Sequence, residues 1–253
     1  MQFDFFEEFP SEETLAPARL WNRPCVVYLA AQSLEEYDRY ADMLRGIQPL
    51  ASPAFWPILP GSYWVSPFSS HADLNALGEM LRSRRDLDVL LDLELPVLAG
   101  KRRLFLRGLP GFFKGRRIIR EILQMDHRFL LAVYPAAGPI SAWLLHALGI
   151  DSRAHESCVM FYTSMIPAWL LRHTIRALGS RAKRGQTTAG FGCLAAGIFG
   201  TEGILSPEAL AQDLAFARSI GLGRIIFFRL AGLDKKFVAV LERALAAQGT
   251  EVQ

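Results

Sequence analysis

Short apolar runs alternate with amphipathic stretches along the whole chain. The apolar runs have the lengths of β-strands, and the stretches between them repeat their apolar residues every three or four positions, as helices packed on one side do. The predicted strands are residues 3–9, 24–30, 54–59, 87–96, 128–135, 157–163, 188–196 and 224–230. The predicted helices are residues 11–21, 33–46, 72–84, 116–125, 139–148, 166–178, 206–219 and 234–247.

Two of these helices have clear boundary signals. Ser33 precedes an amphipathic stretch and is followed three residues later by Glu36, the spacing of a capping box. Ser206 is followed by Pro207, and a cap followed by a first-turn proline is a common helix start. Gly221 then ends that helix.

Eight strand–helix pairs in 253 residues, with no linker or low-complexity tract, predict one domain spanning residues 1–253. Alternating strands and helices require a mostly parallel sheet, and eight pairs at this length match a closed (β/α)8 TIM barrel. An open doubly wound sheet is the alternative. It would usually carry a glycine-rich phosphate turn after its first strand, whereas the turn here is the acidic EEFPSEE.

Two carboxylates end the predicted strand 87–96. Asp92 and Glu94 are two residues apart and therefore point to the same face, together with Leu90. Acids at the end of a buried strand are costly unless they are paired or open into a polar site. Either neighbouring arginines and backbone N–H groups satisfy them, or they line a functional site.

In this fold the active site forms at the C-terminal ends of the strands, called here the C-terminal face. Taken one by one, the polar residues at the predicted strand ends have structural explanations as well: the tyrosines can be core residues, Glu202 can be a loop acid, and Arg229 can neutralise Asp92 or Glu94. Together, acids, tyrosines and exposed tryptophans at one face are typical of a carbohydrate site. The candidate residues at strand ends are Glu8, Tyr28, Tyr63, Trp64, Asp92, Glu94, Tyr134, Met160, Tyr162, Glu202 and Arg229.

The motif D-x-E formed by Asp92 and Glu94 resembles the end of the D-x-x-D-x-D-x-E signature of the family 18 glycoside hydrolases, the chitinase family. The M-x-Y of Met160 and Tyr162 is similar to the motif on the sixth strand of that family. The resemblance implies that Glu94 is the general acid and that Asp92 orients both Glu94 and a substrate acetamido group. It also implies that Tyr162 hydrogen-bonds this acetamido group during substrate-assisted cleavage.

The sequence departs from that family at several positions. Leu87 and Leu90 stand in place of the first two acids of the signature, and Thr163 replaces the acid that follows the sixth-strand tyrosine. Phe228 and Arg229 stand where the family has a tryptophan on strand eight.

Three functions are therefore open. The first is a glycan-acting hydrolase or lyase with no cofactor. The second is a metal-dependent lyase, aldolase or isomerase acting on a small oxygenated substrate, with Mg²⁺ held by Asp92, Glu94 and Glu8, since Mg²⁺ prefers oxygen ligands. The third is a barrel without catalysis that works as a membrane-associated or polyanion-binding protein.

Composition and charge argue against some classes of ligand and partner. The chain is 51% hydrophobic and 21% charged, which allows a large core, and its net charge of +3 is too small to predict nucleic-acid binding. Zinc and iron–sulfur sites are not expected, because the cysteines are scattered and no histidine lies at ligand spacing. We expect these cysteines to be core residues of a cytoplasmic protein: Cys25, Cys158 and Cys193.

A soluble protein is expected. The N-terminal residues have early acids and no basic segment of the kind that begins a secretory signal. Residues 129–150 carry no formal charge, but Pro135, Gly138 and Pro139 interrupt them, which favours a strand, a turn and a helix over one membrane-spanning helix.

Two further features predict contacts outside the barrel. Residues 101–120 are both basic and aromatic, a composition that favours an anionic membrane surface or a polyanion, unless this segment folds back onto the barrel rim. The predicted helices 139–148 and 166–178 are more apolar than outer barrel helices need to be, so we expect a homo-oligomer or a peripheral membrane protein.

Overall fold

The computed structural model describes residues 1–93, 109–133, 155–164, 179, 187–197, 200 and 202–249. Three predicted features lie wholly or largely outside these ranges: the end of the strand 87–96 with Glu94, the helices 139–148 and 166–178, and the first part of the basic segment 101–120.

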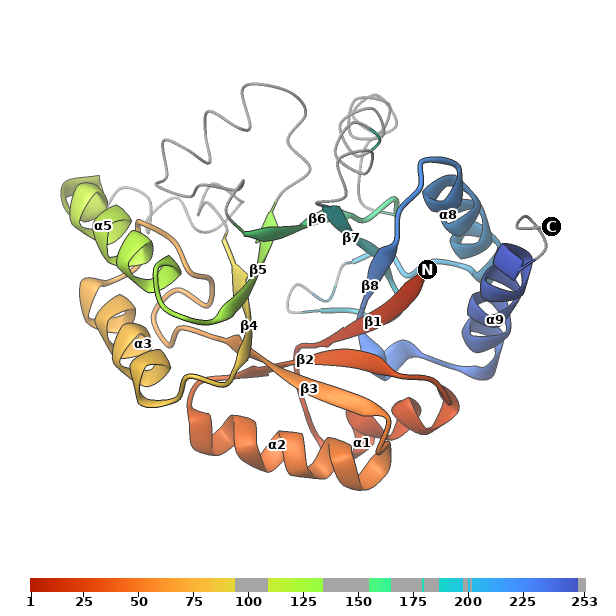
Figure 1. Ribbon diagram of the computed structural model, residues 1–253, viewed down its shortest axis with the longest axis horizontal. Helices are drawn as coiled ribbons and strands as arrows, with labels where there is room; N and C mark the ends of the chain where they lie inside the picture. The colour runs from red at the N-terminus through yellow and green to blue at the C-terminus, as the bar shows by residue number, and fades with distance from the viewer. Residues whose placement is uncertain are drawn as a thin grey trace.

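Eight parallel strands form a closed barrel in sequence order, and β1 pairs with β8 to complete the ring (Figure 1). The prediction of a (β/α)8 TIM barrel is confirmed. The strands are β1 Gln2–Glu7, β2 Cys25–Ala31, β3 Ala51–Pro57, β4 Asp88–Asp92, β5 Arg128–Val133, β6 Glu156–Phe161, β7 Thr187–Cys193 and β8 Arg224–Phe228.

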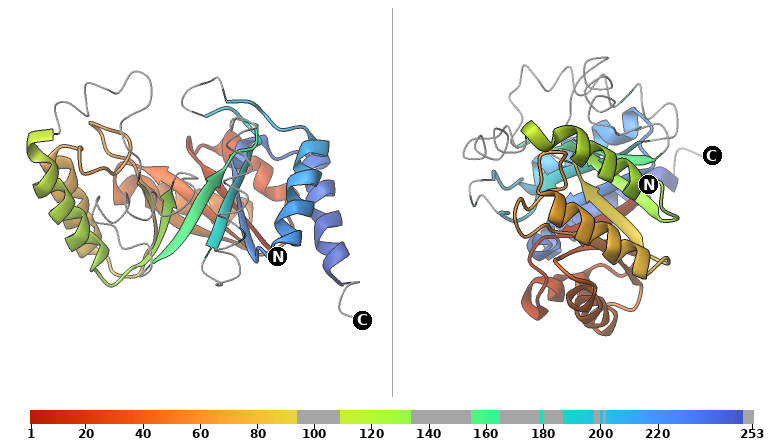
Figure 2. Two further views of the ribbon diagram at one scale, coloured as in Figure 1. Left: turned by 90° about the horizontal axis from the view of Figure 1, so that it is seen from above. Right: turned by 90° about the vertical axis from the view of Figure 1, so that its left-hand side faces the viewer.

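Helices surround the described part of this ring. The α-helices are α1 Glu12–Leu15, α2 Leu34–Ile47, α3 His71–Ser83, α5 Phe112–Leu123, α8 Pro207–Ser219 and α9 Lys235–Gly249. Short 3₁₀ segments are η1 Ala16–Leu20, η2 Leu109–Gly111 and η3 Leu230–Gly232. In Figure 2, α3 and α5 lie side by side at one end of the molecule, and α8 and α9 lie at the other. No helix among the described residues has both the length and the apolar character needed to cross a lipid bilayer.

Local sequence signals explain most helix boundaries. The Ser33 hydroxyl accepts a hydrogen bond from the Glu36 backbone N–H at 3.1 Å, and Ser206 caps α8 in the same way. The predicted helix 11–21 is instead a single α-turn followed by η1, with Pro17 near the start of that 3₁₀ segment. Proline removes a backbone donor, which accounts for the change.

Buried apolar side chains form two separate clusters. One lies between the sheet and the helices, and the other fills the barrel interior and has no helical member among the described residues. The interior cluster comprises Phe6, Tyr28, Ala30, Ala54, Trp56, Leu90, Leu130, Ala132, Cys158, Cys193, Ile226 and Phe228. Leu90 therefore faces inwards, as the alternation along β4 predicts.

At the N-terminal ends of the strands, called here the N-terminal face, the interior is closed by a charged network. Asp4 is fully buried and accepts hydrogen bonds from Arg224 Nε at 2.6 Å and from the Val26 backbone N–H at 2.7 Å. Arg224 also donates to the Tyr28 hydroxyl at 2.8 Å and to Glu156 Oε1 at 3.1 Å. Each buried charge in this network has partners, so this end of the barrel is held together rather than open.

A second buried ion pair joins the C-terminal ends of β1 and β8. Glu7 is fully buried, and its Oε1 accepts from Arg229 Nε at 3.0 Å and from Arg229 Nη2 at 2.9 Å. Its Oε2 accepts from the Ala231 backbone N–H at 2.8 Å. Arg229 also donates to the Ala196 carbonyl at 2.6 Å. Burial raises the pKa of Glu7, although the Arg229 guanidinium and the backbone N–H groups act against this shift.

Removing the arginine of this pair should destabilise the protein in a pH-dependent way. We expect Arg229→Met to lower the free energy of unfolding at pH 7 by about 3–5 kcal/mol, because Glu7 stays buried without its cation. The pKa of Glu7 is then raised further, and a carboxyl with a raised folded-state pKa loses its contribution to stability as the pH rises through that pKa. The stability difference from the unmodified protein should therefore shrink as the pH is lowered from 7 towards about 4.

Urea unfolding at several pH values measures this difference. The double variant Glu7→Gln/Arg229→Met is the control, because it buries no carboxyl and should show no such recovery at low pH. A pH-independent loss in the single variant would contradict the role given to Glu7.

Candidate functional site

Glu8 and Tyr63 meet at the C-terminal face. Glu8 follows directly after β1, is 6% exposed, and its Oε1 accepts a short hydrogen bond from the Tyr63 hydroxyl. Tyr63 has φ +70°, a left-handed conformation that costs a non-glycine residue about 1–2 kcal/mol. Two backbone hydrogen bonds between Leu59 and Tyr63, of 2.8 and 3.0 Å, hold the loop after β3 in this conformation. The loop therefore fixes a phenol against the Glu8 carboxylate.

Aromatic and sulfur-containing side chains lie next to this pair. The Tyr162 and Phe228 rings have centroids 5.8 Å apart, and the Tyr162 hydroxyl lies 3.2 Å from Met160 Sδ. Gly197 connects the two groups, because a Cβ built on it would lie 2.6 Å from the Phe228 ring and 2.8 Å from Glu8 Oε2. The loop after β7 thus approaches the carboxylate as closely as a glycine allows.

Asp92 ends β4 and is 4% exposed. Its backbone carbonyl accepts from the Val65 N–H at 3.0 Å, which ties the loop after β3 to the end of β4. Its negative charge affects the Cys158 thiol inside the barrel. Burial raises the pKa of this thiol, and Asp92 is among the charges that raise it further. Glu94, the predicted general acid, lies outside the described residues.

Glu202 follows β7 and contributes a third carboxylate. Burial raises the pKa of the Cys193 thiol to about 11, and the Glu202 and Glu8 carboxylates add to that shift while a hydrogen bond with Ser164 opposes it. Glu202 and Glu8, which are far apart in the sequence, therefore both raise the pKa of the Cys193 thiol. Glu8, Asp92 and Glu202 give the C-terminal face an acidic character.

Two predicted site residues direct their polar groups elsewhere. Tyr28 lies inside the barrel, but its hydroxyl accepts from Arg224 at the N-terminal face. Arg229, which was expected to bind substrate or to neutralise Asp92 or Glu94, is paired with Glu7 on the outer side of β1.

The remaining aromatic predictions need one correction. Trp64 was expected to be exposed, but it is only 6% exposed, because hydrogen bonds from the Ser62 and Ser69 hydroxyls to its carbonyl fold the loop inwards. Tyr134 lies outside the described residues.

Three residues of this region were not expected from the sequence to take part in it. Trp56 faces the barrel interior from the end of β3 and is in ring contact with Phe6 at 5.8 Å. Cys193 lies in the core, as expected, but its nearness to the Glu8 and Glu202 carboxylates was not expected, and Gly197 had no expected role. No pattern in the sequence distinguishes these positions, because each depends on which strand ends the closed barrel brings together.

A groove extends outwards from Glu8 and Tyr63, over the C-terminal ends of β1 and β2. It has a volume of about 660 Å³ and is also lined by Phe9, Glu36 and Tyr40. Phe9 is 44% exposed, so it offers an aromatic face at the edge of the groove. Carboxylates, phenols and an exposed ring in one groove can hydrogen-bond to and stack against a polyhydroxylated ligand.

The described residues contain no group of three or more histidine, cysteine, aspartate or glutamate side chains close enough to hold a metal ion. His71 and His127 each bond to a backbone carbonyl, at 2.9 and 3.0 Å, away from the barrel interior. The predicted Mg²⁺ ligand set includes Glu94 and so extends beyond the described residues.

Gly197→Ala provides a test of the close approach between the loop after β7 and Glu8. The added methyl group needs Phe228 and Glu8 to move, so we expect a loss of about 1–3 kcal/mol in the free energy of unfolding. Gly223→Ala is the matched control, because its Cβ would meet nothing within 4 Å. Thermal unfolding measures both variants, and equal stability of the two would contradict the packing described here.

Comparisons with known proteins agree with this fold. No protein-family model and no curated protein sequence matches the chain. Among solved structures, a GH18 chitinase from Cycas revoluta in complex with (GlcNAc)3 is 12% identical with a TM-score of 0.56, over 97% of this chain and 100% of that one. A chitinase from Chromobacterium violaceum is 14% identical with a TM-score of 0.55, over 97% of this chain and 99% of that one.

Barrels with other activities are equally similar. A xylose isomerase domain protein from Planctomyces limnophilus is 10% identical with a TM-score of 0.57, over 97% of this chain and 95% of that one. At such low identity these likenesses show the fold, and the chain has a TIM barrel that resembles those of the family 18 chitinases.

Proposed function

We propose that this chain is a glycan-acting hydrolase whose chemistry takes place at the C-terminal face. The observation that carries the proposal is Asp92, a carboxylate that ends β4, is 4% exposed and lies on the face that also holds Glu8 and Glu202. The chitinase barrels that this fold resembles include one solved with (GlcNAc)3, which supports a substrate made of N-acetylated sugars.

In this proposal Glu94 protonates the leaving oxygen of the glycosidic bond. Glu94 follows Asp92 by two residues, so both carboxyls belong to one strand face. Two negative charges at this separation repel each other, which raises the pKa of one carboxyl and favours its protonated form. Asp92 holds that proton in place and orients the substrate acetamido group, whose carbonyl oxygen bonds to the anomeric carbon as the glycosidic bond breaks, and Tyr162 hydrogen-bonds the same group. Water then adds to the anomeric carbon, releases the acetamido oxygen and gives a proton back to Glu94. Glu8, Tyr63, Met160 and Glu202 contact the sugar.

Tyr28 and Arg229 are left out of the proposed binding set, because each is engaged at another place in the barrel. Trp64 contributes by supporting the loop that carries Tyr63, whose ring it contacts at 5.3 Å.

We expect Glu94→Gln and Asp92→Asn each to reduce the cleavage of GlcNAc oligomers by at least 10²-fold, since general acid catalysis contributes factors of this size. Release of reducing ends measures the rate, and circular dichroism checks that the fold is retained. Glu242→Gln, an exposed carboxyl on α9, is the control and should leave the rate unchanged. Full activity of Glu94→Gln would exclude the proposed mechanism.

A metal-dependent lyase or isomerase is the second candidate. Its support is the likeness to the xylose isomerase domain protein and to a D-allulose 3-epimerase from Methylomonas sp., with a TM-score of 0.51. Mg²⁺ would then be held by Asp92, Glu94 and Glu8. Dialysis against a chelator distinguishes the two: sugar-isomerising activity that is lost and then restored by Mg²⁺ favours this candidate, whereas chelator-resistant hydrolysis favours the first.

We also propose that the outer face of α5 contacts anionic membranes. Phe113 is 78% exposed, and the Arg117 side chain one turn later is 80% exposed. Lys114 and Arg120 are exposed on the same helix, while Leu109 just before it is 46% exposed. Exposed aromatic and aliphatic side chains flanked by basic residues match the interface of an anionic bilayer.

Each basic residue near such a surface contributes about 1 kcal/mol, so Lys114→Gln/Arg117→Gln should weaken vesicle binding by about 2 kcal/mol, roughly 30-fold. Co-sedimentation with phosphatidylcholine vesicles, with and without phosphatidylserine, measures this. Lys235→Gln/Lys236→Gln on α9 is the matched control. Equal loss in both double variants would point to net charge alone, and no binding by the unmodified protein would rule the contact out.

A further inference from the structure

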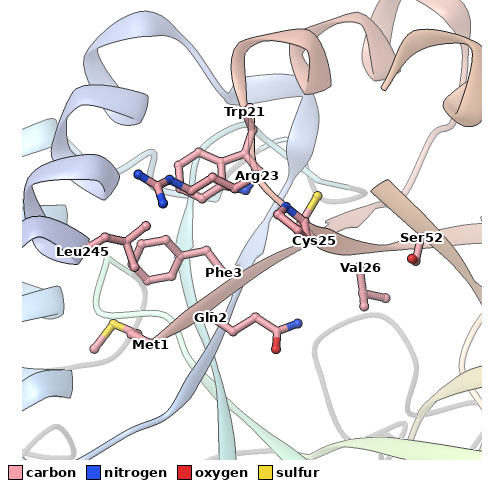
Figure 3. A pocket seen from close by; sticks show the side chains of 10 residues that line it. Met1, Gln2, Phe3, Trp21, Arg23, Cys25, Val26, Ser52 and Leu245 are labelled. Carbon is pink, nitrogen blue, oxygen red and sulfur yellow. The ribbon is translucent and has the colours of Figure 1, made fainter. Parts of the chain in front are cut away.

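A second cavity lies at the N-terminal face, at the opposite end of the barrel from the candidate site. It has a volume of about 420 Å³ and is formed where β1, β2 and β3 begin (Figure 3). Its walls include Phe3, Trp21, Cys25 and Leu245, and Arg23 lies at its edge. Cavities of this size with mostly apolar walls and few polar groups are typical of small-molecule sites.

The lining is mostly apolar. Gln2 and Ser52 are polar but uncharged, and Arg23 is the one charged side chain among the described residues that line the cavity. Phe3 and Trp21 are each 2% exposed, and their ring centroids lie 5.9 Å apart. Burial raises the pKa of the Cys25 thiol to about 12, so this side chain carries no charge at neutral pH. The Trp21 indole N–H is buried and has no acceptor within the described part of the chain. A buried donor without an acceptor is unusual, and an oxygen atom of a bound ligand could accept a hydrogen bond from it.

Arg23 supplies a positive charge at the edge of the cavity. It is exposed, and no carboxylate pairs with it among the described residues. The buried carboxylate on this side of the barrel, Asp4, is already bound by Arg224, by Val26 and by the Gln2 side chain. In the view of Figure 3 the Arg23 guanidinium extends across Trp21 in the direction of Leu245, and Arg23, Leu245 and Phe3 all line the cavity.

We propose that this cavity binds a small carboxylic acid with an apolar chain or ring. The carboxylate would pair with the Arg23 guanidinium, which matches its geometry with two parallel hydrogen bonds. The apolar part would lie against Phe3, Trp21 and Leu245. One charged side chain beside mostly apolar walls suits a monoanion, whereas a phosphate or a polyanion would call for several cationic side chains.

Isothermal titration with 3-phenylpropionate and with its neutral analogue 3-phenylpropanamide tests the proposal. We expect saturable binding of one carboxylate per chain, at least tenfold tighter than the amide. Arg23→Gln should remove that preference. Arg19→Gln is the matched control, since Arg19 is also exposed, lies in the neighbouring 3₁₀ segment η1 and is not part of the cavity wall, and it should bind as the unmodified protein does.

Nuclear magnetic resonance locates the ligand independently. Of the five tryptophan indole N–H signals, the one lost in Trp21→Phe should shift when 3-phenylpropionate is added. The proposal is overturned by an absence of saturable binding, by equal affinity for acid and amide, or by unchanged acid binding in Arg23→Gln. None of these readouts depends on catalysis, so the result is separate from the proposed hydrolase activity.

Discussion

Closure of the barrel between β1 and β8 is the constraint on which the rest of the structure depends. The two strands come from opposite ends of the sequence, and a buried carboxylate of β1 meets an arginine from the β8 region at each end of the junction. Asp4 binds Arg224 at the N-terminal face, and Glu7 binds Arg229 at the other end. Buried ion pairs contribute little net stability but penalise any arrangement that separates them. They therefore select one pairing of these strands.

Closure of the barrel also places different polar groups at its two ends. At the N-terminal face the Arg224 guanidinium binds the Asp4 and Glu156 carboxylates and the Tyr28 hydroxyl, so each of these groups has a partner. At the C-terminal face, Glu8, Asp92 and Glu202 bring negative charge to strand ends, and Tyr63 and Tyr162 stand among them. One end of the barrel is thus held by a paired charge network, and the other carries the candidate site at the face where barrels of this fold have their active sites.

Much of the fold follows from the sequence, because repeated strand and helix signals leave few arrangements for eight βα units. The caps at Ser33 and Ser206 and the inward direction of Leu90 are confirmed. Strand alternation gives the face of a side chain but not the end of the barrel its polar group reaches, which is why the Tyr28 hydroxyl was misplaced. Arg229 lies beyond the last residue of β8, where alternation no longer applies.

The two neighbouring glutamates at the end of β1 point to opposite faces of the strand and have different partners. Glu7 faces outwards and belongs to the framework, whereas Glu8 faces the candidate site. A shift of β1 by one residue would exchange them, placing one carboxylate where the other is needed. Deleting or inserting a single residue in this strand would therefore damage folding and function together, so homologous chains should tolerate length changes in the loop after Glu8 far better than before Glu7.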